Sequence, residues 1–137
     1  MTILQRTGEV LIHGLKIIVM KLEVIDVLKG QEENTNYPPF RVMKSIVVGG
    51  YRLSVQGSEG HYCSPRQTLP RDDYWEMEVA IINGKNAMVN ARKSSFLRKF
   101  ARYLELVDRM DGCRYGYVPV DLINDLYLYL KTRDEKV

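Results

Sequence analysis

The stretch from Phe40 to Gly57, FRVMKSIVVGGYRLSVQG, decides the fold. Two runs rich in β-branched and aromatic residues lie on either side of Gly49-Gly50, and such runs are typical of strands. Both glycines can adopt positive φ, which a tight two-residue connection between strands requires. The stretch therefore predicts an antiparallel β-hairpin.

Further strands are expected on both sides of this hairpin. Towards the N-terminus, LIHGLKIIV and MKLEVIDVL, residues 11–28, predict two short strands or one bent strand. The polar segment from Lys29 to Pro39 ends in Pro-Pro and predicts a loop. Beyond the hairpin, WEMEVAIIN, residues 75–83, alternates as a strand covered on one side does, and Asn83-Gly84 predicts another turn. We expect an N-terminal extension or strand over residues 1–19 and a β-rich part over residues 20–90.

The apolar spacing becomes helical after Ser94, which is suited to be an N-cap. The run DGCRYGYVPV, residues 111–120, breaks this helix and is expected to be extended. A second helix is expected to begin near Pro119, with Asp121 at its positive end. Strands followed by two helices, within a helical part over residues 91–131, predict an α+β fold: an N-terminal antiparallel β-sheet with two C-terminal helices packed against it.

Size and composition restrict the class of protein. A chain of 137 residues, 45% hydrophobic and 27% charged, is expected to form a single domain over residues 1–137. No apolar run approaches the roughly 20 residues of a membrane helix. Two cysteines favour a reducing compartment, and a net charge of +3 is small for a protein that binds long nucleic acid. We expect a cytoplasmic protein with neither a membrane nor long nucleic acid as its partner.

The segment GHYCSPR, Gly60 to Arg66, concentrates the chemically versatile side chains. Cys63 has a histidine two positions away, but no residue is identified that would orient this base, so a buried thiol is the expected state. The histidines and cysteines of the chain show no zinc-ligand spacing. We therefore predict no catalytic residue, no metal and no cofactor, and we expect that the protein is not an enzyme.

The same segment has the features of a pocket wall. Pro65 favours an extended, stiff backbone, which places Tyr62, Ser64 and Arg66 on one side and Cys63 towards the core. Several of the nine tyrosines lie within a few residues of an arginine. A guanidinium group can grip phosphate, and a tyrosine ring can stack on a base, so the combination suits a nucleotide. Tyrosines that fill the edge of the core are the alternative.

The order of these motifs resembles a known family. FRVMKSIVVGGYRLSVQGSEGHYCSPR, then EMEVAI, then YGYVPVDLINDLYLYL resembles the layout of the phage-encoded Thoeris anti-defence (Tad) sponges of the first type, over roughly residues 20–130. The resemblance implies a phage protein in the cytoplasm of an infected bacterial host. It also implies a homo-oligomer, a dimer or a higher assembly such as a hexamer, that sequesters cyclic ADP-ribose isomers without cleaving them. Some relatives are similar to sponges for cyclic oligonucleotides.

The resemblance also implies which residues bind the ligand. It carries over most directly to Tyr62 and Arg66, and more loosely to Arg109 and Arg114 near the late motif. The family leads us to expect a stacking aromatic near EMEVAIIN, where this chain has none, so Phe96 or Tyr115 is expected to take that role. The candidate ligand-binding residues are Tyr62, Arg66, Arg92, Phe96, Arg109, Arg114 and Tyr115.

A second hypothesis concerns the six basic residues between Lys85 and Arg102, a segment without an acidic residue. As an inhibitor or regulator from a phage or mobile element, the chain would present a basic helix from Arg92 to Arg109 to a protein or nucleic acid. An enzyme acting on a nucleotide is a third hypothesis, and a solvated helix face without a ligand is a fourth.

Overall fold

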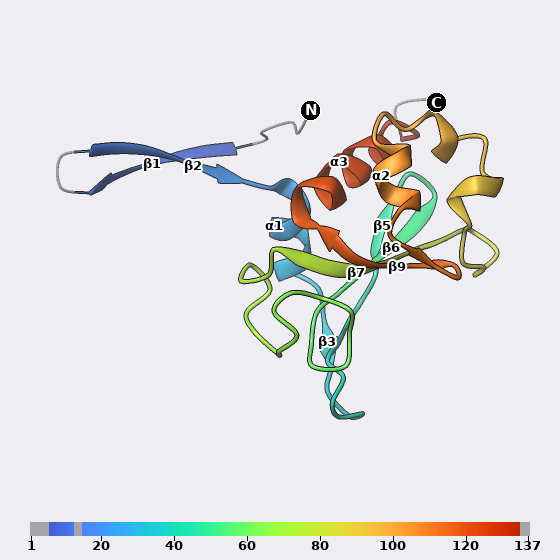
Figure 1. Cartoon of the computed structure of the whole chain (residues 1–137), viewed down its shortest axis with the longest axis horizontal. Helices are drawn as coiled ribbons and strands as arrows, with labels where there is room; N and C mark the ends of the chain where they lie inside the picture. The colour runs from blue at the N-terminus through green and yellow to red at the C-terminus, as the bar shows by residue number, and fades with distance from the viewer. Residues whose placement is uncertain (1–5, 13–14, 135–137) are drawn as a thin grey trace.

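The structure of the chain is a computed structural model that describes residues 6–12 and 15–134. It contains strands, α-helices and two short 3-10 turns (Figure 1). In chain order they are β1 (Arg6–Ile12), β2 (Leu15–Lys21), α1 (Glu23–Lys29), β3 (Glu33–Asn34), β4 (Val42–Met43), β5 (Ile46–Val48), β6 (Tyr51–Gln56), β7 (Glu76–Ile82), η1 (Ala91–Lys93), η2 (Leu97–Lys99), α2 (Tyr103–Val107), β8 (Met110–Asp111), β9 (Arg114–Pro119) and α3 (Val120–Lys131). The predicted α+β class is confirmed.

The centre of the fold is a five-stranded antiparallel sheet in the order β5-β6-β7-β9-β8. The predicted hairpin is its first pair, because β5 and β6 are joined by Gly49 and Gly50 at φ values of 60° and 79°. The predicted strand in residues 75–83 is β7, and the extended run after residue 110 supplies β8 and β9.

One face of the sheet forms the core. Leu53 pairs with Ile81 and Val55 with Val79 in the strand register, and all four side chains are buried. Helix α3 packs against β5, β7 and β9, with Leu122, Ile123, Leu126 and Leu130 buried. It begins after Pro119, as predicted, and Asp121 lies in its first turn. The opposite face of the sheet carries half-buried side chains such as Ser54 and Ala80.

Two predicted elements are wrong. The run MKLEVIDVL was expected to be a strand, but Glu23–Lys29 is helix α1. Val24 and Leu28 lie four residues apart and are fully buried, so the helical spacing gives this segment an apolar stripe that packs towards α3. The backbone N–H of Val24 also donates to Asn124 Oδ1 at 3.0 Å.

The long helix expected after Ser94 is replaced by η1, η2 and the short α2. Ser94 does cap a turn, because its hydroxyl accepts from the N–H of Leu97 at 3.1 Å. The chain then leaves helical geometry at Phe100, which has φ −63° and ψ 131°. Tyr129 on α3 stacks on Phe96 with ring centroids 4.5 Å apart and donates its hydroxyl to the Phe96 carbonyl. These tertiary contacts compensate for the lost helical hydrogen bonds.

The N-terminal strands β1 and β2 pair with each other, and Figure 1 shows their hairpin extending away from the rest of the chain. His13 and Gly14, in the first predicted strand run, lie outside the described residues. In the part of the chain that the structure describes, no helix has the length and apolar character needed to cross a membrane.

The hairpin turn gives a test of the fold. A Cβ atom at Gly49 would lie 2.0 Å from the carbonyl oxygen of Leu130, whereas a Cβ at Gly50 would meet nothing within 4 Å. Both alanine variants carry the cost of positive φ, about 1 kcal/mol. We expect Gly49→Ala to lower the free energy of unfolding by about 1–3 kcal/mol more than Gly50→Ala, measured by urea denaturation, because the turn must move off α3. Equal losses in the two variants would contradict this packing.

Candidate functional site

A cavity of about 480 Å³ opens on the face of the sheet opposite the core. Its floor comes from three neighbouring strands, and Ser54, Ala80 and Arg114 are aligned across them by the strand register. The floor side chains are Ser54 and Gln56 of β6, Glu78, Ala80 and Ile82 of β7, and Arg114 of β9. Ligand pockets usually measure about 300–1,000 Å³, so this cavity is of a size suited to a small molecule.

The walls of the cavity come from the chain at the start of β4 and from the loop that follows β6. One wall carries Phe40 and Val42, and the other carries Gly60, His61, Tyr62 and Arg66. The Arg66 guanidinium carbon lies 5.1 Å from the centroid of the Tyr62 ring, and Arg66 Nε donates to the carbonyl of Glu59 at 3.2 Å. The Tyr62 side is therefore an aromatic ring paired with a cation, as the sequence predicted for this segment.

A β-bulge on β9 holds Tyr62 in place. Met77 faces Val118 and Val79 faces Tyr115, so Glu78 stands opposite two residues, Gly116 and Tyr117. Tyr117 has φ 52°, and its N–H turns to the Tyr62 carbonyl at 2.9 Å. A Cβ at Gly116 would lie 3.2 Å from the Tyr62 Cβ, so glycine allows the loop to approach β9 closely.

A buried arginine and a buried tyrosine anchor the loop at its base. Arg41 donates to the carbonyls of Leu69 at 2.6 Å and Gly57 at 2.9 Å, and to the Tyr74 hydroxyl at 3.2 Å. The same hydroxyl donates to the Gln67 carbonyl at 2.6 Å and accepts from the Leu69 N–H at 2.8 Å. Both ends of the segment 57–74 are thereby fixed to one cluster.

The Phe40 wall depends on a glycine and a histidine. A Cβ at Gly60 would lie 2.5 Å from Phe40 Cδ1, so the ring lies directly on the loop backbone. His61 packs against Phe40 in an edge-on arrangement, with ring centroids 5.3 Å apart, and its Nδ1 is 2.6 Å from the Ser58 hydroxyl. Burial lowers the pKa of His61 below 6.5, and the nearby Glu78 carboxylate opposes this shift in part.

Cys63 points into the core, as predicted, and is 1% exposed. Its Sγ lies 3.3 Å from the carbonyls of Ser58 and Pro65. Burial raises the pKa of this thiol, the opposite of what a nucleophilic thiolate requires. Over the described ranges, 6–12 and 15–134, no three His, Cys, Asp or Glu side chains gather as metal ligands would.

The structure brings together Tyr62, Arg66 and Arg114 of the predicted ligand-binding residues. Tyr115 is corrected: it is fully buried, and its hydroxyl is bonded to the backbone of Val89 and Ala91, so its ring has no face for a ligand. Neighbouring strand residues point to opposite faces, and Arg114 takes the open one.

The remaining predicted residues lie elsewhere. Arg109 pairs with Glu76 at 3.5 Å and donates to the Tyr117 carbonyl, so it supports the bulge from outside the cavity. Phe96 lines a separate hollow with Tyr51 and Arg133, whose guanidinium carbon lies 5.4 Å from the Phe96 ring centroid. Arg92 is exposed in η1. The cavity is therefore built around three of the seven predicted residues.

Glu78 and Phe40 are among the cavity residues that were not predicted. Glu78 could have been found from the alternation of β7, which places it on the face opposite Met77 and Val79. Phe40 lies directly after Pro38-Pro39 in a segment read as the end of a loop. Its position against Gly60 is a tertiary contact without a signal in the local sequence.

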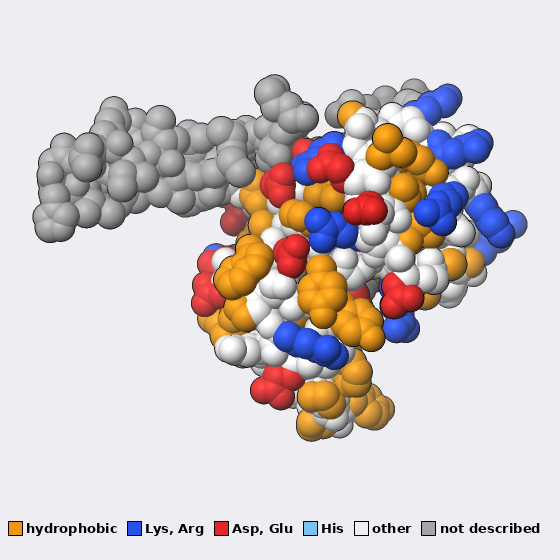
Figure 2. Space-filling view, viewed as in Figure 1, with side chains coloured by type: hydrophobic (Ala, Val, Ile, Leu, Met, Phe, Trp, Pro, Cys, Tyr) orange, Lys and Arg blue, Asp and Glu red, His pale blue; other side chains and the backbone are white. Residues whose placement is uncertain are grey.

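Basic side chains gather away from the cavity. Figure 2 shows Lys and Arg over the part of the chain that Figure 1 draws in yellow and orange, where Arg92, Lys93, Arg98 and Lys99 are exposed. Arg102, by contrast, pairs with Glu105 at 2.7 Å, Asp125 at 2.9 Å and Asp121 at 3.0 Å. The hydrogen bonds that Arg102 donates to these carboxylates, above all to Glu105, raise the pKa of Arg102.

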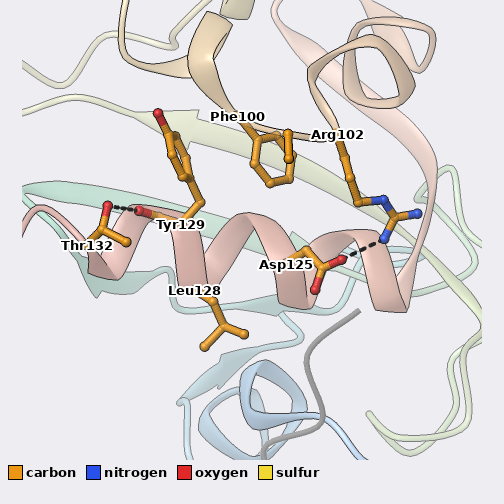
Figure 3. A pocket seen from close by; sticks show the side chains of 7 residues that line it. Phe100, Arg102, Asp125, Leu128, Tyr129 and Thr132 are labelled. Carbon is orange, nitrogen blue, oxygen red and sulfur yellow. Dashed lines mark hydrogen bonds and ion pairs between the residues drawn. The ribbon is translucent and has the colours of Figure 1, made fainter. Parts of the chain in front are cut away.

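A smaller hollow of about 240 Å³ lies against α3, and Arg102 forms part of its lining. Figure 3 shows Arg102 reaching Asp125, with Phe100 and Tyr129 alongside on the same side of the helix. Its one cation is already paired with carboxylates, so it offers less to an anionic ligand than the cavity on the open sheet face.

No protein-family model matches the chain, and no solved structure gives a significant match.

The anchor of the loop can be tested by removing one oxygen atom. Tyr74→Phe deprives the Leu69 N–H and Arg41 of a partner in a buried cluster, so we expect a loss of about 1–3 kcal/mol in the free energy of unfolding. Urea denaturation measures this loss. Tyr37→Phe is the matched control, because Tyr37 is 71% exposed, and it should change stability by less than about 0.5 kcal/mol. Similar small effects in both variants would contradict the anchoring role of Tyr74.

The lowered pKa of His61 predicts a pH dependence of stability. The unfolded chain takes up a proton near pH 6.5, whereas the folded chain does so only at a lower pH. The contribution of neutral His61 to the free energy of unfolding is therefore fully present above pH 6.5. It is lost as the pH drops towards the pKa of His61 in the folded chain. Melting temperatures of the wild type and His61→Asn between about pH 5 and 7.5 should converge or cross on acidification. A constant difference between the two proteins would contradict the shift.

Proposed function

We propose that the chain binds a small cyclic nucleotide in the cavity on the open sheet face. The observation that carries this proposal is the convergence of Tyr62, Arg66 and Arg114 on one concave site. Tyr62 is 43% exposed and Phe40 42%, so both walls present aromatic surface to the cavity. Arg114 is exposed at the end of the floor, and Arg66 stands over the Tyr62 ring.

The energetics of this arrangement suit a phosphate-bearing ring compound. Stacking of a base on an aromatic side chain contributes about 1–3 kcal/mol. Guanidinium groups can form paired hydrogen bonds with phosphate oxygens, and such charge-assisted bonds are about twice as strong as neutral ones. A nanomolar Kd corresponds to a binding free energy of about −12 kcal/mol. Stacking and phosphate contacts must therefore act together with shape complementarity.

The biological role we propose is sequestration of an immune second messenger. The motif order that resembles the Tad sponges of the first type points to cyclic ADP-ribose isomers, with cyclic oligonucleotides as the related class. The protein would act in the cytoplasm of an infected bacterial host. The resemblance also implies a dimer or a higher homo-oligomer.

We propose capture without cleavage. Cys63 is a buried thiol, and His61 is held by Ser58 and kept neutral by burial at physiological pH. Neither is arranged as a nucleophile with its general base. Lowering the free concentration of the messenger needs only binding, so no reaction is required of the site.

The second hypothesis, in which a basic helix from Arg92 to Arg109 binds a protein or nucleic acid, has less support than ligand binding in the cavity. A partner groove recognises a continuous helical face, whereas residues 92–109 form two 3-10 turns and a five-residue helix. Arg102, in the middle of this segment, is already bound to three carboxylates.

The proposal is tested by ligand-induced thermal stabilisation with cyclic ADP-ribose isomers and cyclic di- and trinucleotides. We expect the wild type to be stabilised, by about 3 kcal/mol at a ligand concentration of 100 times Kd. Arg66→Ala and Arg114→Ala should each abolish the shift while the unliganded melting temperature stays close to that of the wild type, since both side chains are exposed. Arg92→Ala is the matched control and should keep the full shift.

Full shifts in the Arg66 and Arg114 variants would reject this site. Intact ligand recovered after heat denaturation of the complex is the expected result, and a cleaved product would reject capture without cleavage. Binding of long DNA or RNA that weakens steeply with salt, in place of ligand binding, would favour the basic segment.

A further inference from the structure

The cavity contains an acid as well as two arginines. Among the described residues that line it, Glu78 is the single carboxylate, and it stands on the floor between Gln56 of β6 and the bulge of β9. An unpaired carboxylate in a site for phosphates repels them, so its presence calls for a ligand group that it can bind.

The Glu78 carboxylate has acceptor capacity to spare. It accepts a long hydrogen bond, 3.4 Å, from the Tyr62 N–H. Within the described part of the chain, it forms no ion pair with Arg66 or Arg114. A carboxylate has two oxygens and about four lone-pair directions, so at least one O–H or N–H donor of a ligand can be accepted.

The position of Glu78 selects which donor this is. On one side its carboxylate contacts the backbone of Tyr62, whose ring is the proposed stacking surface for a base. On the other side, Ala80 lies two residues along β7 and pairs in register with Arg114, the candidate phosphate ligand. In a nucleotide, the group that connects the base to the phosphate is the ribose. A carboxylate that accepts from the ribose 2′-hydroxyl is a common means of sugar recognition.

We infer that Glu78 is a specificity-determining residue that accepts a hydrogen bond from a ribose 2′-hydroxyl of the ligand. The inference rests on the proposed function, because it assigns one contact within the same cavity. It narrows the ligand class to cyclic ribonucleotides with a free 2′-hydroxyl and excludes their 2′-deoxy and 2′-phosphorylated counterparts.

The test compares matched ligand pairs by isothermal titration calorimetry. The probes are cyclic ADP-ribose and 3′,5′-cyclic di-AMP, each with its 2′-deoxy counterpart. The quantity compared is the ratio of the Kd of the deoxy form to the Kd of the ribose form. For a ribose form that binds, we expect this ratio to be about 10 to 100 in the wild type, which corresponds to a hydrogen bond to a charged group. In Glu78→Ala this ratio should fall to near one, because the deoxy form had no bond to lose.

Two further variants keep the result interpretable. Glu78→Gln retains an oxygen for the Tyr62 N–H, so it preserves the loop if the alanine variant is unstable, and its ratio should also fall. Glu59→Gln removes the same charge from an exposed position on the loop of residues 57–74, outside the cavity lining, and its ratio should equal that of the wild type. Loss of a carboxylate strengthens the binding of any anionic ligand. This effect is the same for the ribose and the deoxy form, so it cancels in the ratio of their Kd values.

The outcomes separate the two proposals. A ratio near one in the wild type, or an unchanged ratio in both Glu78 variants, overturns the role of Glu78 while binding itself stands. If the wild type binds neither these probes nor any other cyclic ADP-ribose isomer, cyclic dinucleotide or cyclic trinucleotide of the stabilisation panel, cyclic nucleotide binding fails and the role of Glu78 fails with it.

Discussion

The contact between Arg41 and Tyr74 is the interaction on which the cavity depends. A buried guanidinium is costly unless its N–H groups find acceptors. Here two loop carbonyls and a phenol oxygen accept from its two terminal nitrogens, and its Nε, which forms no hydrogen bond, lies 3.9 Å from the Glu33 carboxylate. Since those acceptors lie at both ends of the segment 57–74, a loop without regular secondary structure acquires a fixed base. Phe40 directly precedes Arg41 in the chain, so the same residue also sets the opposite wall. Two walls from separate segments are thus positioned by one buried cluster.

The sheet contributes a floor of mixed charge. On the core side, β6 and β7 carry the apolar residues that the fold needs, and alternation leaves the other side free for polar groups. The bulge at Gly116 and Tyr117 interrupts the pairing of β9 with β7 where the loop must attach, and the Tyr117 N–H binds the Tyr62 carbonyl of that loop. Bulges are frequent beside binding sites for this reason. Stability and recognition are therefore divided between the two faces of the same strands.

Local patterns predicted those elements whose cause is local. The Gly-Gly turn, the alternation of β7 and the start of α3 at Pro119 were all readable, because each follows from backbone preference or from a period of two. The segment 23–29 was not, since Val24, Ile25 and Val27 favour a strand while burial of Val24 and Leu28 against α3 selects a helix. The break at Phe100 likewise depends on Tyr129, a residue distant in the chain. For the site, Tyr62 and Arg66 followed from short spacing, and Arg114 from a looser likeness. Tyr115 could have been excluded by alternation, because a strand cannot turn both Arg114 and Tyr115 to one face.

The placement of Trp75 has a practical consequence. It is the single tryptophan of the chain, 62% exposed, and its backbone N–H bonds to the Ser64 carbonyl while its own carbonyl accepts from Val120. The backbone of Trp75 thus joins the loop of residues 57–74, strand β7 and the first turn of α3, and its exposed indole lies at this joint. Its fluorescence emission spectrum therefore reports on that joint without an added label. Because the chain has one tryptophan, the whole tryptophan signal comes from this position.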